Sequence, residues 1–313
     1  MLTIFAVPKP FTGPIAQLQD NALRSWRGLG EDVEVLLLGD DTGVAEAARA
    51  HGFRHLPQVT CNAHGTPLVS SIFELAARHA RFEILVYVNA DIILLGDFLA
   101  AVKHASRLRR FLMIGQRTDL DVTERLDVGD AACAGQILAR AAEHGKIHAR
   151  SGIDYFTFRK GLWNTIPPFA LGRTAWDNWL VYGARARGAA IVDATEATRV
   201  IHQNHDYGHV PASSGSAWTG AEAQLNKQLA GAPERLMDIN DATWRLTPLG
   251  DLVPVLDWPR IQRRLQVAPL LHSWLRPVRR PLHLGIAGVD RIVRWIAPAA
   301  GGQGKAPGRG HRG

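Results

Sequence analysis

The chain has 313 residues, of which 46% are hydrophobic, so it contains enough apolar material for one large domain or two small ones. The two cysteines, Cys61 and Cys133, have neither the number nor the spacing of a disulfide framework or a thiolate zinc site, which favours a reducing compartment. The N-terminus lacks the basic region of a signal peptide, and no apolar run reaches the ~18 residues of a membrane span, so the sequence predicts a cytoplasmic protein.

The net charge of +7 is concentrated at the C-terminus. Residues 260–313 contain 11 Lys or Arg and one acidic residue, whereas residues 1–259 contain 25 basic and 28 acidic residues. No nucleic-acid recognition motif accompanies the basic residues, so nucleic acid is not an expected partner. A basic, apolar segment indicates peripheral attachment to an anionic surface at the inner face of a membrane. The alternative is that its apolar face packs on the rest of the protein.

In the first 95 residues, apolar runs typical of buried strands alternate with stretches of helical periodicity. Strands are expected at 2–7, 33–38, 53–56 and 84–88, and helices at 15–26, at 43–51 and over the segment that contains Ile72, Leu75, Ala76 and His79. This alternation predicts an α/β fold with a mostly parallel central sheet covered by helices on both faces.

After residue 95 the pattern is less regular. Helices are expected at 98–106, from about Ala175 and at 221–229, strands at 111–115, 152–158, 189–192 and 199–202, and a polar stretch at 117–121. The expected organisation is a main domain at 1–215, its irregular or helical C-terminal part at 216–265, a basic amphipathic segment at 266–298 and a disordered tail at 299–313.

The strongest predicted strand, 84–88, ends in Asn89-Ala90-Asp91. Ligands of open α/β sheets bind at the carboxyl ends of the strands, so these side chains are candidates for a binding site. The alternative is an ordinary turn, because Asn and Asp are common turn residues. The body has no G-x-x-x-x-G-K-[ST] sequence and no G-x-G-x-x-G after a strand, and a carboxylate with a bound cation is another way to hold a diphosphate.

Asn89-Ala90-Asp91 resembles the DxD motif of the GT-A glycosyltransferases, and the segments 151–156, 176–179 and 202–207 follow in the order of that family. Over roughly its first two thirds, the chain therefore resembles the family 2-like nucleotide-diphospho-sugar transferases. The resemblance implies a Rossmann-like GT-A fold with a C-terminal helical extension, and transfer of a sugar to a glycan, lipid or small-molecule acceptor. Asn89 departs from the family's first Asp and removes one negative charge.

The resemblance also assigns roles to residues on the donor side. Asp91 would bind Mn²⁺ or Mg²⁺ at the donor phosphates, and Asn89 would contact the ribose or a metal-bound water. The acids after the second strand, Asp40 and Asp41, would accept hydrogen bonds from the nucleobase, although a solvated turn is an equal interpretation. Pro8 and Lys9 follow the first strand, where Lys9 would offset phosphate charge. A surface position is the alternative for Lys9 and for two further cations, Arg117 and Arg173.

On the acceptor side, Asp177 is the expected general base, because an attacking hydroxyl must lose its proton to a positioned group. Its alternative is a helix-capping acid. Asp154 is a second candidate, since its segment resembles the part of the fold beneath the transferred sugar. Trp176, Trp179 and Tyr155 are expected to contact the acceptor or the sugar, because aromatic faces suit sugar rings. Direct displacement with Asp177 as base predicts inversion at the anomeric carbon.

A dense histidine cluster follows the strand predicted at 199–202. One interpretation is that His202 completes the metal site, in which case an imidazole ligand favours Mn²⁺. Another is a zinc hydrolase that uses His202, His205 and His209, and a third is a solvated loop. A non-catalytic nucleotide-sugar or glycan binding protein of the same fold is the further alternative, which the Asn89 departure makes plausible.

Overall fold

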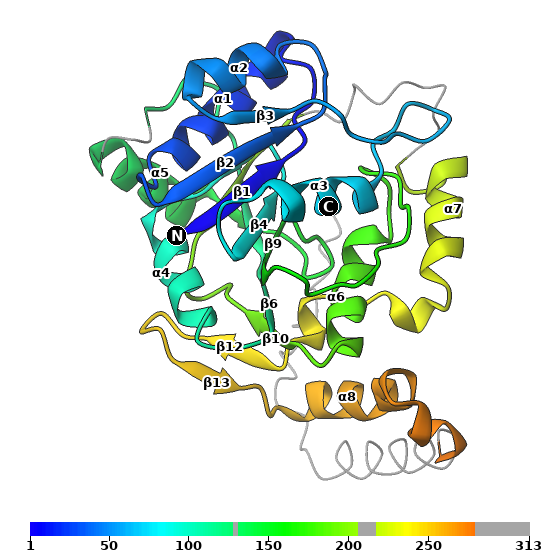
Figure 1. Ribbon diagram of the computed structural model, residues 1–313. Coiled ribbons are helices and arrows are strands. Elements are labelled where there is room, and N and C mark those ends of the chain that lie inside the picture. Colours follow the sequence, from blue (N-terminus) through cyan, green and yellow to red (C-terminus); the bar gives the residue numbers. More distant parts are fainter. Residues whose placement is uncertain (128–130, 206–216, 279–313) are drawn as a thin grey trace, which may run out of the picture. The chain divides into compact units, whose positions relative to one another are not determined.

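The computed structural model describes residues 1–127, 131–205 and 217–278 (Figure 1). The chain forms two compact units, Met1–Arg260 and Ile261–Gly313. The first unit contains the central sheet and the described residues of the candidate active site.

The described part of the first unit contains a nine-stranded sheet with the order β13-β12-β10-β6-β9-β4-β1-β2-β3. All of its strand pairs are parallel except those made by β9 and by β13. Its strands are β1 (Leu2–Ala6), β2 (Val33–Leu38), β3 (Arg54–Leu56), β4 (Ile84–Val88), β6 (Phe111–Ile114), β9 (Tyr155–Arg159), β10 (Ala190–Asp193), β12 (Trp244–Leu246) and β13 (Leu252–Pro254). The predicted α/β fold with a mostly parallel central sheet is confirmed.

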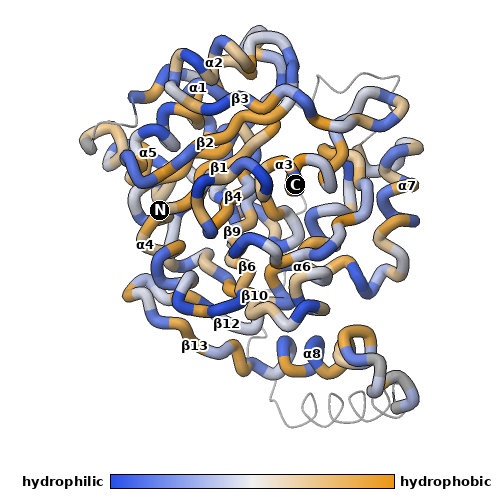
Figure 2. Tube along the Cα trace, in the orientation of Figure 1, coloured by the Kyte–Doolittle hydropathy of each residue, from blue (hydrophilic) through white to orange (hydrophobic). Residues whose placement is uncertain are grey.

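The central strands are buried along their whole length, which explains their continuous apolar sequences. Every residue of β1 and of β4 is buried, because parallel strands in an α/β fold are covered on both faces. Figure 2 shows hydrophobic residues along most of β2, with hydrophilic residues on the surrounding helices and loops. The helices that flank the sheet are α1 (Gly13–Arg27), α2 (Val44–His51), α3 (Val69–His79), α4 (Gly96–Ala105), α6 (Trp176–Ala186) and α7 (Ala221–Ala230).

A second, four-stranded sheet has the order β5-β11-β7-β8. It comprises β5 (Ile92–Ile93), β7 (Arg117–Leu120), β8 (Lys146–Ile147) and β11 (Val200–Gln203). Its apolar face packs with α5 (Ala131–His144) in a separate core that includes Leu120, Ile137 and Ile201. The sequence predicted only a polar stretch at 117–121, and the strand β7 in that segment, together with α5 and β12, was not predicted. Arg117 and Asp119 are compatible with a strand because their charges are paired there.

The C-terminal part of the described chain consists of α8 (Trp258–Leu271) and a 3-10 helix (Ser273–Val278). Most of the predicted basic segment at 266–298, and all of the tail at 299–313, lie outside the described residues. Among the residues that the structure describes, no helix is both long enough and apolar enough to cross a membrane.

Candidate active site

Several predicted site residues lie at the carboxyl edge of the large sheet. Lys9 follows β1, Asp40 follows β2, and Asn89 follows β4. Asp154 reaches the same edge from the opposite chain direction, because β9 runs antiparallel to β4 and Val88 pairs with Tyr155. The backbone N–H of Asn89 donates to the carbonyl of Asp154 at 3.0 Å, which extends this pairing past the end of β4.

Asp91 lies beside two histidines. Its Oδ2 is 3.1 Å from His205 Nε2 and 3.9 Å from His202 Nε2, and the side chains of all three residues are largely buried. Potential ligand atoms of the three residues all lie within 4.8 Å of one another. The other oxygen, Asp91 Oδ1, is buried without a hydrogen-bond partner among the described residues. One carboxylate with an unsatisfied oxygen and two imidazoles fit a divalent transition metal.

The protonation states of these groups also suit a cation site. Burial raises the pKa of Asp91, but the hydrogen bond with His205 and the charges of His202 and Lys9 outweigh burial and lower the pKa to about 2. Burial lowers the pKa of His202, although the charge of Asp91 opposes this effect. An ionised carboxylate and a neutral imidazole are the forms that bind metals.

Buried amides fix the loop after β4 against α1 and β11. Gln203, the last residue of β11, donates from Nε2 to the carbonyl oxygens of Leu18 at 2.7 Å and of Asp91 at 3.1 Å. Asn21 in α1 donates to Gln203 Oε1 at 3.0 Å. His202 is the residue before Gln203, so the same contacts hold the strand that carries it. Gln203 was not among the predicted site residues, because a polar residue at a strand end gives no signal of this role.

A second chain of polar contacts begins at Tyr87. The Tyr87 hydroxyl donates to Asn89 Oδ1 at 3.1 Å, and Asn89 Nδ2 donates to Asp154 Oδ1 at 2.7 Å. The other oxygen of Asp154 accepts from Arg117 Nη1 at 2.6 Å, and Arg117 Nε donates to Asp119 Oδ1 at 2.7 Å. Both oxygens of Asp154 are therefore engaged, which favours a positioning role for this residue over the predicted role of a second base.

Arg117 is 8% exposed, so it is buried and does not have the surface position that was the alternative for this residue. Burial would lower the pKa of its guanidinium, but the charges and hydrogen bonds of Asp154 and Asp119 outweigh burial and raise the pKa. The other cation, Arg173, pairs with Glu222 at 2.7 Å. The sequence contained no signal for either pairing, because the partners of both arginines come from distant segments or from a strand that was not predicted.

Asp177 is half-buried in the first turn of α6. Burial raises its pKa to about 7, and the charge of Asp154 adds to this effect, while backbone hydrogen bonds oppose it. Burial also raises the pKa of Tyr87, and the charges of Asp91, Asp154 and Asp177 add to this effect. A carboxylate with a pKa near neutrality is suited to accept a proton.

The backbone just before Asp177 is strained. Ala175 has φ 84° and is the one non-glycine residue with positive φ among the described residues. Its side chain is fully buried, and its carbonyl accepts from the N–H of Trp179 at 3.0 Å in the first turn of α6. Strain of this kind costs about 1–3 kcal/mol and is often retained where a functional group must be aimed.

The aromatic residues predicted to contact sugars have different surroundings. Tyr155 is fully buried with its ring against Phe98, so this placement does not support contact with a sugar. Trp176 is 6% exposed and packs on Tyr87 and Phe156 in the core beneath the site. Trp179 is only partly buried and packs against Phe169 and Tyr182.

The remaining donor-side predictions fall in the loops of the carboxyl edge. Asp40 and Asp41 are exposed after β2. Pro8 is buried and Lys9 is exposed, and the backbone N–H and carbonyl of Lys9 are both hydrogen-bonded to the side chain of Gln19 in α1. His209, the third residue of the alternative zinc site, lies outside the described residues.

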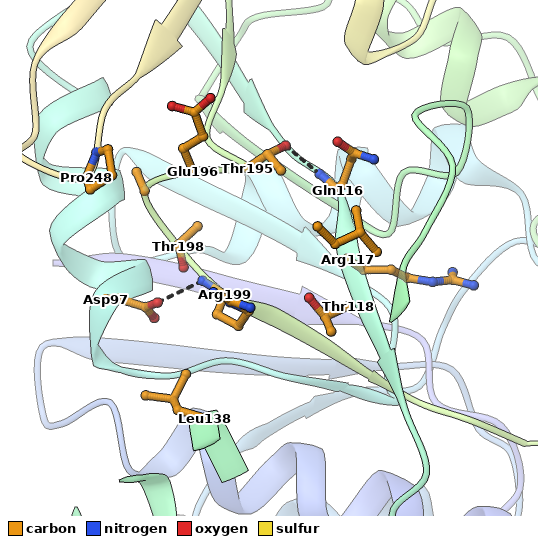
Figure 3. Close-up of a pocket in the computed structure, with 12 residues that line it drawn as sticks. Asp97, Gln116, Arg117, Thr118, Leu138, Thr195, Glu196, Thr198, Arg199 and Pro248 are labelled. Carbon is orange, nitrogen blue, oxygen red and sulfur yellow. Dashed lines mark hydrogen bonds between the residues drawn. The ribbon is translucent and has the colours of Figure 1, made fainter. Parts of the chain in front are cut away.

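The structure also contains a pocket of about 410 Å³, and Figure 3 shows the side chains that line it. Its lining includes Asp97, Thr195, Thr198 and Arg117. Figure 3 shows the guanidinium of Arg117 extending away from Asp97 and Thr198. Asp91, Asp177, His202 and His205 are not among the residues that line this pocket, so the pocket is separate from the Asp91 cluster.

No protein-family model matches the chain, and no curated protein sequence matches it. Solved structures do match, and three of them have the following similarities. TarS 1–349 from S. aureus in complex with UDP-GlcNAc has 13% identity and a TM-score of 0.45, over 69% of this chain and 62% of that chain. The mannosyltransferase PcManGT from Pyrobaculum calidifontis in complex with GDP-Man and Mn²⁺ has 16% identity and a TM-score of 0.42, over 66% and 58%.

Glucosyl-3-phosphoglycerate synthase from M. tuberculosis has 14% identity and a TM-score of 0.44, over 82% of this chain and 88% of that chain. The chain thus spans about 60% of the length of the TarS and PcManGT chains. The similarity to these three structures concerns the mixed α/β arrangement alone.

Proposed function

We propose that this protein transfers a sugar from a nucleotide-diphosphate sugar to an acceptor, with a divalent metal at Asp91. The observation that carries the proposal is the buried Oδ1 of Asp91, which has no hydrogen-bond partner within the described parts of the chain and belongs to a carboxylate that also faces His202 and His205. The cluster lies at the carboxyl edge of a mostly parallel sheet, which is where open α/β sheets bind ligands.

Asp91, His202 and His205 are the residues that would hold the metal, and the two imidazoles favour Mn²⁺ over Mg²⁺. A bound cation supplies electrophilic stabilisation of the negative charge that develops on the departing diphosphate. Lys9 contributes a further positive charge close enough to lower the pKa of Asp91. The donor phosphates are therefore expected between the loop after β1 and the loop after β4.

Asp177 is the proposed general base. Its carboxylate accepts the proton of the acceptor hydroxyl as the hydroxyl oxygen forms the new bond to the anomeric carbon. The bond between that carbon and the diphosphate oxygen breaks, and the nucleoside diphosphate leaves with the electron pair. Asn89, Asp154 and Arg117 support the site from below, because Asp154 accepts hydrogen bonds from both Asn89 and Arg117. A direct displacement of this kind inverts the anomeric configuration.

Thermal unfolding with a panel of nucleotide sugars tests the proposal. UDP- and GDP-linked sugars should raise the Tm of the wild-type protein in the presence of Mn²⁺ and much less in its absence. Asp91→Ala should remove the metal-dependent part of the shift, whereas the matched control Asp32→Ala, at an exposed carboxylate, should keep it. Metal-independent shifts of equal size in the wild-type protein and in Asp91→Ala would contradict the proposed role of Asp91.

A non-catalytic binding protein is the alternative, and turnover distinguishes it from the enzyme. The pKa of about 7 at Asp177 favours the enzyme, because a binding site has no need of a group that titrates near neutrality. Donor binding without hydrolysis or transfer across a broad acceptor panel would favour the binding protein. Zinc-dependent hydrolysis that survives Asp91→Ala would favour the hydrolase.

We also propose that the basic C-terminal segment binds an anionic membrane surface. The described part of this segment exposes 75% of Trp274, which lies two residues before Arg276 in the sequence, and Leu265, just before the segment, is 38% exposed. Aromatic and aliphatic side chains next to basic residues are typical of interfacial segments.

A further inference from the structure

We infer that Asp119 is a positioning residue that holds His202 in the tautomer and orientation needed to bind the metal. The inference rests on the proposed metal site and deepens it, because it assigns a role to a residue that does not touch the cation. Asp119 follows Arg117 and Thr118 in a strand that the sequence analysis did not predict.

The two nitrogens of His202 face two different carboxylates. Nδ1 lies 3.1 Å from Asp119 Oδ1, and Nε2 lies 3.9 Å from Asp91 Oδ2. The first separation is short, but it lacks the alignment of a hydrogen bond, and Nδ1 has no hydrogen-bond partner among the described residues. The adjacent negative charge of Asp119 favours a proton on Nδ1, which leaves the lone pair of Nε2 on the side of Asp91.

Strand pairing fixes this arrangement. Asp119 and His202 are direct partners in the parallel pair β7–β11. His202 also pairs with Ile92 on the other side, in the antiparallel pair β11–β5. The backbone of His202 is thus held between two strands, and its side chain is 5% exposed. The Asp119 contact acts on a ring that has little freedom to move elsewhere.

Asp119 is itself fixed by two further groups. Arg117 Nε donates to Asp119 Oδ1 at 2.7 Å, and His148 Nδ1 lies 2.8 Å from Asp119 Oδ2. Arg117 is held in turn by Asp154, which also accepts from Asn89. Asp119 therefore links the metal cluster to the polar chain beneath the site, and neither of its oxygens can turn away without breaking a contact.

This geometry is the carboxylate–histidine–metal arrangement, in which an outer carboxylate orients a metal-bound imidazole. Removing such a carboxylate lowers metal affinity by about 10–100-fold. For His202, the expected cause is that the ring is free to carry its proton on Nε2, where the N–H would point at the cation site. Loss of the charge of Asp119 would also weaken cation binding, so the experiment must separate the two effects.

A double-mutant cycle on Mn²⁺ affinity makes this separation. Proton relaxation of water measures Mn²⁺ binding to the wild-type protein, Asp119→Ala, His202→Ala and the double variant. If Asp119 acts through His202, Asp119→Ala should weaken binding about 10–100-fold in the wild-type background and have little effect in the His202→Ala background. Equal effects in both backgrounds would indicate long-range charge alone and would overturn the inference. Asp127→Ala removes an exposed carboxylate and serves as the matched control.

The same titrations separate failure of this inference from failure of the proposed function. If the wild-type protein binds no Mn²⁺, the proposed metal site is wrong. If it binds Mn²⁺ and Asp119→Ala binds equally well, only the role of Asp119 is overturned. Asp119→Asn replaces Asp119→Ala in the cycle if the alanine variant does not fold, and it should lose less affinity because an amide oxygen can still accept from Nδ1.

Nitrogen NMR of metal-free protein gives a readout that a merely structural role would not change. Long-range ¹⁵N–¹H spectra should place the proton of neutral His202 on Nδ1 in the wild-type protein, and on Nε2 in a substantial fraction of Asp119→Ala. His202 protonated on Nε2 in the wild-type protein would overturn the inference regardless of the metal affinities.

Discussion

Asn89 donates from its side-chain amide to Asp154 Oδ1 at 2.7 Å, and this contact accounts for the asparagine in a motif that resembles DxD. The amide oxygen of Asn89 accepts from the Tyr87 hydroxyl, so both ends of the amide have partners. An aspartate here would place a second carboxylate against Asp154. The polar contacts of Asn89 therefore explain why position 89 has no negative charge. Asp91, His202 and His205 form the candidate metal site without a contribution from residue 89.

Restoring the acid at position 89 should destabilise the protein. Asn89→Asp removes a partly buried donor and brings two carboxylates together, with an expected loss of about 1–3 kcal/mol of unfolding free energy at pH 8. The repulsion raises the pKa of the new acid, so its protonated form regains a donor and the loss should shrink at pH 5. Urea unfolding at both pH values measures the effect. Asn240→Asp, at an exposed site, is the control, and a stability loss no larger than that of the control would contradict the prediction.

The pKa of Asp177 predicts how activity depends on pH. A base must be ionised, and the pKa of about 7 means that the active fraction rises as pH increases through neutrality. At pH 5, kcat/KM should be roughly a hundredfold below its plateau, since each pH unit below the pKa reduces the ionised fraction about tenfold. Asp177→Asn should lower kcat by at least about 100-fold with donor affinity unchanged. A pH-independent rate between pH 5 and pH 8 would remove Asp177 from this role.

The same group predicts a dependence of stability on pH. The folded-state pKa of about 7 lies above the ordinary value of 3.8, so the protonated acid is favoured in the folded state. The stabilisation of the folded state by protonated Asp177 is complete below the ordinary pKa and is lost as pH rises through 7. The side chain that Asp177→Asn introduces does not ionise. The unfolding free energy of this variant, relative to that of the wild-type protein, should therefore rise by about 1 kcal/mol from pH 5 to pH 8, a value reduced for the partial exposure of this group. Equal stability differences at the two pH values would count against a raised pKa.

Arg117 should be important for stability, because it is the cation between two largely buried carboxylates. Arg117→Met leaves Asp119 and Asp154 without their guanidinium partner and should cost about 3–5 kcal/mol of unfolding free energy. The matched control is Arg78→Met, which breaks an ion pair with Glu74 whose side chains are 62% and 67% exposed, and which should cost less than about 1 kcal/mol. Chemical denaturation compares the two, and similar losses would mean that the buried network contributes little.

The C-terminal segment should confer binding to acidic lipid. The full chain should co-sediment with vesicles that contain phosphatidylserine, and binding should fall as salt is raised, because surface attraction is screened by salt. A chain that ends at Asp257, before α8, should sediment much less. Equal sedimentation of both chains would show that residues 258–313 are not the attachment site.

The sequence by itself determined the elements whose signal is local. The apolar strand at 84–88, the alternation that builds the parallel sheet, and the helix that carries Asp177 were all predicted, because periodicity reports burial along a single segment. Asp91 was found for the same reason, since it follows the clearest strand. Its metal role and the base role of Asp177 stay predictions.

Tertiary structure alone decided which polar groups meet. Residues 117–120 have no apolar alternation. They form the strand β7 because β11 and β8 pair with them on either side. Asp119 and His202 are neighbours only through that pairing. Arg117 donates a hydrogen bond to Asp154, which lies 37 residues further along the sequence. Ion pairs and hydrogen bonds between distant segments leave no periodic trace in a sequence, because their energy depends on burial and distance that the whole fold sets.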